Sequence, residues 1–265
     1  SPGCCITIWS LDTLAPIVLF FIFGIIAGSF LNVVIYRFPR NQSLVRPGSH
    51  CVHCKTTIPF YRNIPIISFL IQGGRCHKCK QKISIQYPIV EFLSGIGWAW
   101  CLSVYAPLEA GFLILLYSIF IVIAWIDGFT MNIPFILIFI AFIVEISGLV
   151  LGILPLKESI FGALVGVGSL GLIMLVTFLI TKRQGMGFGD VQLGLVLGVL
   201  LGPIYIVFTF VIASFLSLIV WVGISSAKGF QMNRALPFAP FLITSGIMLF
   251  VMNYYLTGSI LQFFI

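Results

Sequence analysis

The stretch Gly185-Met186-Gly187-Phe188-Gly189-Asp190 is a glycine-rich hinge that opens directly into the apolar run from Val191 to Leu201. It places an acid where a membrane helix begins, next to backbone that carries little side-chain bulk. The chain contains only three aspartates, and a second one, Asp127, also stands at the end of an apolar run. We expect the fold to bring Asp127 and Asp190 together in one site.

The composition predicts a membrane protein. Of the 265 residues, 60% are hydrophobic and 8% are charged, and the mean hydropathy is +1.17. A soluble domain of this length would need far more polar surface. We therefore expect an all-α polytopic membrane protein, because helices satisfy their own backbone hydrogen bonds in lipid. About eight transmembrane helices fit the apolar runs, at residues 15–36, 88–105, 110–127, 133–153, 159–181, 190–201, 204–226 and 237–257.

The cations are distributed unevenly along the chain. Nine of the 14 Lys and Arg residues fall between Arg37 and Lys82, a segment without Asp or Glu. Such a patch can bind nucleic acid, but a loop that follows the positive-inside rule and faces an anionic leaflet explains it better, so we expect no nucleic-acid partner. If the loop at 37–86 is cytoplasmic, the loops at 182–189 and 227–236 are too, and together the three hold 13 of the 14 cations. Both aspartates then lie at the cytoplasmic boundary.

Two carboxyl groups at one membrane face can form an aspartic protease dyad, in which one ionised and one protonated acid flank a water molecule. Glycines at Gly185, Gly187 and Gly189 leave room for an extended substrate backbone beside Asp190. The alternative is that the glycines form only a loop and that Asp190 is the N-cap of the next helix. Because Asp190 starts a helix and Asp127 ends one, we expect Asp190 to carry the charge and Asp127 the shared proton.

Four cysteines form two CxxC pairs, Cys51-Val52-His53-Cys54 and Cys76-His77-Lys78-Cys79, which are separated by 21 residues. This spacing suits a tetrahedral metal site with four thiolates. Two disulfides are the alternative, which a reducing cytosol disfavours. We predict a structural Zn²⁺ ion, because four thiolate ligands leave no open coordination position.

Several motifs resemble, in the same order, those of bacterial type IV prepilin peptidases. They are Ser29-Phe30-Leu31-Asn32-Val33-Val34-Ile35-Tyr36-Arg37, the twin CxxC pairs with Asn63-Ile64-Pro65 between them, Tyr87-Pro88-Ile89-Val90-Glu91, Ile126-Asp127 with Pro134, and Gly185-Met186-Gly187-Phe188-Gly189-Asp190, which resembles the GxGD motif. One position departs from the pattern: many relatives carry lysine two residues after the second aspartate, where this chain has Gln192.

The resemblance implies a GxGD-type intramembrane aspartic protease of the bacterial inner membrane, with Asp127 and Asp190 as its catalytic acids. Such enzymes remove the basic leader from type IV prepilins and pseudopilins at the cytoplasmic face. They also methylate the new N-terminal residue with S-adenosylmethionine. The expected partners are therefore prepilin or pseudopilin substrates and the lipid bilayer.

We divide the chain into residues 1–36 (N-terminal segment and first transmembrane helix), 37–86 (cytoplasmic basic module with the zinc site) and 87–265 (seven-helix membrane peptidase domain). No residue shows by itself where S-adenosylmethionine binds. Three alternatives stay open: a peptidase without methyltransferase activity, a non-catalytic membrane scaffold stabilised by zinc, and a transporter that uses the intramembrane Glu145.

Overall fold

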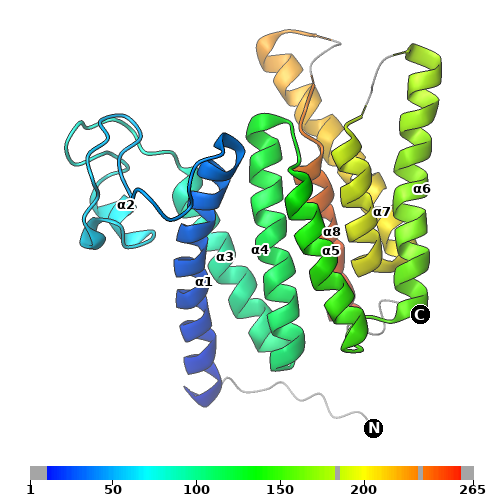
Figure 1. Cartoon of the computed structure of the whole chain (residues 1–265), viewed down its shortest axis with the longest axis horizontal. Coiled ribbons are helices and arrows are strands. Elements are labelled where there is room, and N and C mark those ends of the chain that lie inside the picture. Colours follow the sequence, from blue (N-terminus) through cyan, green and yellow to red (C-terminus); the bar gives the residue numbers. More distant parts are fainter. Residues whose placement is uncertain (1–10, 183–185, 232–234, 258–265) are drawn as a thin grey trace. The chain divides into compact units, whose positions relative to one another are not determined.

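The computed structural model describes residues 11–182, 186–231 and 235–257, and over these ranges the chain is helical, with no strand longer than an isolated bridge. The prediction of an all-helical protein is confirmed. Figure 1 shows the helices, which are α1 (Leu11–Arg37), α2 (Ile67–Ile71), α3 (Gln86–Val104), α4 (Pro107–Thr130), α5 (Phe135–Val150), α6 (Leu156–Thr181), α7 (Phe188–Lys228) and α8 (Ala239–Thr257). Two short 3-10 turns, η1 (Phe38–Arg40) and η2 (Phe60–Arg62), lie between α1 and α3.

Five helices are long and apolar enough to cross a membrane: α1, α4, α6, α7 and α8. The predicted runs 190–201 and 204–226 form one element, α7, whose backbone leaves the helical region at Gly202 (φ 74°, ψ 175°). Glycine adopts a positive φ readily, and the following Pro203 has no N–H to continue the helix. With α7 counted as two segments, the helices other than α2 give the eight segments that the sequence predicts.

The first segment of α7, from Phe188 to the break at Gly202, is short for a membrane span. It begins two residues earlier than expected, and neighbouring elements shield it: of the residues from Val191 to Gly202, all except Gln192 and Leu195 are buried. Packing inside the protein therefore compensates for its limited length.

The chain forms two compact units, residues 1–121 and 122–265, and α4 contributes to both. In the first unit, α1 and α3 pack at close range through small residues. A Cβ added at Gly24 would lie 2.7 Å from the Ser94 carbonyl oxygen, and one added at Gly28 would lie 2.7 Å from the Glu91 Cα. Only glycine permits this approach, as is common where membrane helices associate.

In the second unit, α6 and α7 lie side by side (Figure 1) and touch along glycines. A Cβ added at Gly162 on α6 would lie 2.0 Å from the Gly198 carbonyl oxygen on α7. One turn further along, a Cβ at Gly166 would lie 2.1 Å from the carbonyl oxygen of Gly194. Each helix thus presents a GxxxG pattern to the other. This contact fixes the first segment of α7, which carries Asp190.

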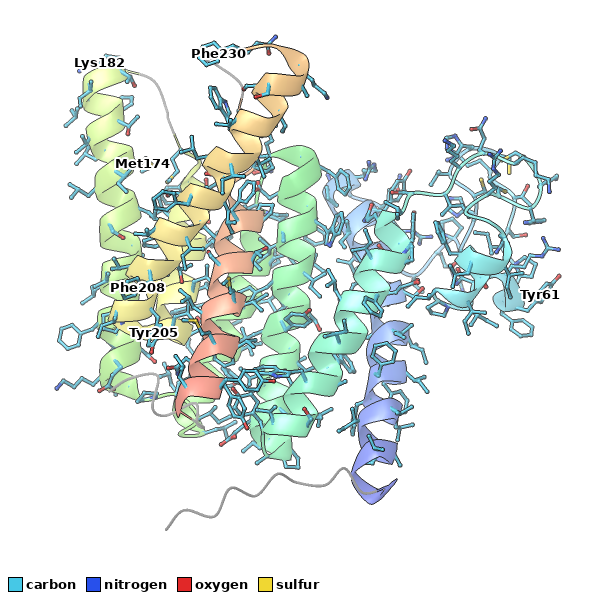
Figure 2. All side chains as sticks on the ribbon, turned by 180° about the vertical axis from the view of Figure 1, so that it is seen from behind. Tyr61, Met174, Lys182, Tyr205, Phe208 and Phe230 are labelled. Atoms are coloured by element: carbon cyan, nitrogen blue, oxygen red, sulfur yellow. The ribbon has the colours of Figure 1, made fainter. Side chains whose placement is uncertain are left out.

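Polar side chains also join α7 to α8. The hydroxyl of Tyr205, labelled in Figure 2, donates to Asn253 Oδ1 at 2.7 Å. The hydroxyl of Ser245 donates to the Thr209 carbonyl oxygen at 3.1 Å. Hydrogen bonds of this kind hold helices together in a membrane, where the apolar surroundings give little driving force for their association.

Residues 37–86 form a small module that hydrogen bonds attach to the end of α1. The buried guanidinium of Arg37 donates to the carbonyl oxygens of Ser43 at 2.9 Å and Pro47 at 2.7 Å. The module contains η1, η2, the short helix α2 and two isolated bridges, His50 with Thr57 and Arg75 with Lys82.

Candidate active site and metal centre

Asp127 lies in the last turn of α4 and is buried, with 5% of its surface exposed. The helix ends just after it, where Met131 takes a positive φ of 51° and donates its N–H to the Asp127 carbonyl oxygen at 2.8 Å. The Asp127 carboxylate accepts the backbone N–H of Ala239, the first residue of α8, at 3.1 Å. The side chain at the end of one helix therefore caps the beginning of another.

Asp190 is half-buried in the first turn of α7. The helix starts at Phe188 and its N-cap is Gly187, so the interpretation of Asp190 as the N-cap is wrong. Asp190 instead occupies the third helical position, and its side chain accepts the backbone N–H of Gly187. An acid at this position commonly bonds back to the N-cap amide in this way.

The fold brings the two acids together. Asp127 and Asp190 interact Coulombically, although 62 residues separate the two positions along the chain. Each carboxyl group accepts one backbone N–H at a helix N-terminus, where the helix dipole favours negative charge. A helix dipole therefore favours the charged form of both acids, and not of Asp190 alone as the sequence suggested. The sequence has no local pattern which indicates that the start of α8 faces Asp127.

The glycines before Asp190 have different surroundings. A Cβ at Gly189 would lie 2.9 Å from the Cβ of Ile133, so this glycine lets the start of α7 pack against the α4–α5 connection. A Cβ at Gly187 would meet the Asp190 carboxylate at 3.3 Å, and Gly187 is exposed. Gly185 lies outside the described residues.

The four cysteines of the CxxC pairs meet in one cluster. The sulfur atoms of Cys51, Cys54, Cys76 and Cys79 all lie within 4.8 Å of one another, and all four side chains are free thiols. The Cys51 and Cys79 sulfurs are 3.8 Å apart, well beyond the length of a disulfide bond. This set of four sulfur ligands fits a tetrahedral metal ion.

The two CxxC pairs share one backbone geometry. In the first, Lys55 takes a φ of 57° and donates its N–H to the Cys51 carbonyl oxygen at 2.9 Å. In the second, Lys80 takes a φ of 60° and donates to the Cys76 carbonyl oxygen at 3.0 Å. The local turn thus aims both thiols of each pair in one direction.

Hydrogen bonds favour the deprotonation of two of the four thiols. The hydroxyl and the backbone N–H of Thr56 lower the pKa of Cys54 to about 6. The backbone N–H groups of Cys79 and Lys78 lower the pKa of Cys76 below its ordinary value. At Cys79 the backbone N–H of Gln81 lowers the pKa, but burial and the other three thiols outweigh this bond and raise the pKa to about 11. Metal ions bind the thiolate form, so the bonds to Cys54 and Cys76 favour metal binding by these two residues.

Two polar residues noted in the sequence have structural roles. Asn32 on α1 donates to the Tyr87 carbonyl oxygen on α3 at 3.1 Å, as expected for an amide that joins two helices. The buried Glu91 accepts the backbone N–H of Ile66 at 2.7 Å and a bond from Ser29, and so ties the module to α3. Ile66 takes a φ of 59°, which is unusual for a β-branched residue.

Glu145 on α5 is completely buried, and neither carboxyl oxygen has a hydrogen-bond partner among the described residues. An unpaired acid in such a place costs stability. The α6–α7 contact is indicated in the sequence by two GxxxG motifs, at 162–166 and 194–198.

Comparison with known proteins relates both units to one group of enzymes. Residues 22–105 match the family described as Bacterial Peptidase A24 N-terminal domain, and residues 114–222 match the Type IV leader peptidase family. No solved structure matches the chain.

Three relatives illustrate the similarity. The prepilin leader peptidase/N-methyltransferase of Neisseria gonorrhoeae is 33% identical over 88% of this chain and 89% of its own length. The enzyme of the same name from Pseudomonas aeruginosa is 29% identical over 91% of each chain. The type 4 prepilin-like proteins leader peptide-processing enzyme of Escherichia coli is 31% identical over 84% of this chain and 89% of its own length. The chain belongs to the type IV leader peptidase family.

Proposed function

We propose that the chain cleaves the leader peptide from type IV prepilins and pseudopilins, with Asp127 and Asp190 as the catalytic pair. The observation that carries this proposal is that the fold brings two carboxyl groups at helix ends near enough to interact electrostatically in a membrane protein. Acids inside a membrane are expensive to bury, and two neighbouring acids can lower this cost by sharing a proton.

In the proposed reaction, the ionised carboxyl of the pair takes a proton from a water molecule, and the protonated one donates a hydrogen bond to the scissile carbonyl oxygen. The water oxygen attacks the carbonyl carbon, and the amine leaves after it receives a proton from the pair. The backbone N–H groups of Ala239 and Gly187 hold one oxygen of each carboxyl group and so orient the other toward the reacting atoms. Water enters from the side of Asp190, the more exposed of the two acids.

The substrate backbone lies beside Gly187 in this proposal. Gly187 is exposed and adjacent to the Asp190 carboxylate. The space beside Gly189, in contrast, is filled by the side chain of Ile133. A side chain at position 187 would enter the space that the scissile peptide needs. The apolar segment that follows the leader in a prepilin then docks laterally among the helices.

We further propose that residues 37–86 hold a structural Zn²⁺ ion on Cys51, Cys54, Cys76 and Cys79, and that the helices of residues 87–265 form the peptidase domain. The cation count of the loops supports a cytoplasmic position for the module and the acid pair at the inner membrane. Relatives named for both activities support N-methylation of the new N-terminal amine, for which S-adenosylmethionine supplies the methyl group.

A single experiment tests both activities. The purified protein is incubated with a prepilin and S-adenosylmethionine, and the product is weighed by mass spectrometry. We expect loss of the leader and gain of one methyl group. Asp127→Asn and Asp190→Asn should each lower the cleavage rate by about 10²–10⁴-fold or more, whereas Asp12→Asn, which changes the third aspartate, should not.

The alternatives predict different products. Leader loss without methyl gain would show that the protein is a peptidase without methyltransferase activity. A membrane scaffold or a transporter predicts no cleavage by the wild type, and its function would survive both Asn substitutions. If Asp127→Asn or Asp190→Asn cleaves at the wild-type rate, these two residues are not the catalytic pair.

A further inference from the structure

The module between α1 and α3 exposes one strongly apolar segment, residues 60–71. Its exposed apolar side chains are Phe60 (87% exposed), Tyr61 (56%), Ile64 (44%), Ile67 (53%), Leu70 (70%) and Ile71 (81%). They come from η2, α2 and the short connection between them. Soluble surfaces rarely expose so many large apolar side chains in twelve consecutive residues, and such a patch usually marks an interaction site.

A hydrogen bond fixes the level of this segment along α3. The N–H of Ile66, in the middle of the segment, donates to the carboxylate of Glu91 at 2.7 Å. Glu91 is five residues into α3, so it lies about 7.5 Å beyond the first residue of that helix. The segment is therefore held beside the first turns of α3 rather than beyond the end of that helix. Figure 1 shows α2 alongside the C-terminal half of α1, and Figure 2 shows Tyr61 at the edge of the module.

With the start of α3 at the membrane surface, this level lies in the interface of a bilayer. Peripheral amphipathic elements bury their apolar face about 5–10 Å into the boundary between headgroups and acyl chains. The aromatic residues Phe60 and Tyr61 are neighbours in the exposed edge, with ring centroids 5.7 Å apart. Tyrosine is favoured at this depth because its ring is apolar and its hydroxyl is polar.

The positive charge of the same module favours contact with anionic lipids. Seven cations of the module are exposed, namely Arg40, Arg46, Lys55, Arg75, Lys78, Lys80 and Lys82, and residues 37–86 contain no acidic residue. Cations next to an interfacial apolar surface attract anionic headgroups. A prepilin leader is itself cationic, so its charge does not complement this surface.

We propose that residues 60–71 form a membrane-interface anchor, with their apolar side chains in the outer part of the acyl region and the surrounding cations on anionic lipid headgroups. Glu91 sets the depth of the anchor through its bond to Ile66. The metal-binding module is thereby held flat against the membrane next to α1 and α3. The proposal does not depend on the peptidase or methyltransferase activity.

Photo-crosslinking in a bilayer tests the anchor. The photoreactive amino acid p-benzoylphenylalanine is introduced into the full chain at Tyr61 or at Ile71, and at Val52 as a control. Val52 is an exposed apolar residue of the same module, in the first CxxC pair. The protein is placed in nanodiscs of phosphatidylethanolamine and phosphatidylglycerol, irradiated, and examined for lipid adducts by mass spectrometry. An unchanged far-ultraviolet circular dichroism spectrum and an unchanged elution volume in size-exclusion chromatography confirm that each variant is folded.

We expect lipid adducts at positions 61 and 71 with a yield at least several-fold above that at position 52. In nanodiscs of phosphatidylcholine alone, the yield at position 71 should fall at least twofold. Equal yields at positions 71 and 52, or adducts at position 71 that form with an added prepilin and not with lipid, would overturn the anchor. A yield at position 71 that is independent of phosphatidylglycerol would overturn the preference for anionic headgroups.

Discussion

The glycine contact between α6 and α7 predicts opposite effects for the same substitution at two positions of one helix. A Cβ at Gly162 would lie 2.0 Å from the Gly198 carbonyl oxygen and 2.7 Å from the Gly202 Cα. Ordinary van der Waals contact begins at 3.4 Å, so Gly162→Ala must push the two backbones apart by about 1.4 Å. Neither contact atom belongs to a flexible side chain that can move aside. Overpacking of this kind costs about 1–3 kcal/mol, and rigid backbone on both sides favours the upper end.

Gly168 on the same helix provides the matched control, since a Cβ there would meet nothing within 4 Å. Alanine in an open helical position is more stable than glycine by about 0.5–1 kcal/mol, because the unfolded glycine has more conformational freedom to lose. We therefore expect Gly162→Ala to destabilise the protein and Gly168→Ala to stabilise it slightly, a difference of about 1.5–4 kcal/mol.

Reversible unfolding in mixed micelles, followed by circular dichroism, measures this difference. Gly162→Ala should also slow leader cleavage, because the first segment of α7 carries Asp190 and would shift with the helix. If the two alanine variants unfold at the same denaturant concentration, or if Gly168→Ala is the less stable one, the close α6–α7 contact is not present in the protein and the reasoning fails.

Three further predictions concern the metal centre, the buried acid and the hinge. Cys54→Ser should lower the zinc content measured by mass spectrometry, whereas Cys101→Ser, which changes a cysteine outside the cluster, should retain it; equal zinc contents would contradict the four-thiolate site. Glu145→Leu should raise the free energy of unfolding by about 1–3 kcal/mol and preserve cleavage, since it removes an unpaired buried acid; lower stability would reveal a partner for Glu145. Gly189→Ala, which would clash with Ile133, should slow cleavage by ~10²-fold in a kinetic assay, and an unchanged rate would show that the hinge tolerates the shift.

Local patterns in the sequence predicted most of the helices. Each apolar run is long enough to identify a helix, and Gly202-Pro203 marks the break within α7 because both residues disfavour continuation. The cysteine cluster was also predictable, since a CxxC pair directs two thiols to one point and two such pairs complete a tetrahedral set. The start of α7 was misplaced by two residues, because Phe188 and Gly189 give no clear boundary signal.

Hydrophobicity, charge and spacing are local properties of the chain, and they are enough to predict a helical membrane protein with two acids at helix ends and four cysteines for one metal ion. Three contacts could be learned only from the folded chain: the start of α8 faces Asp127, Ile133 packs on Gly189, and Glu91 holds the module beside α3. Each of these contacts joins the side chain or backbone of one segment to a segment far away in sequence, and no local pattern specifies which distant partner will fill the space.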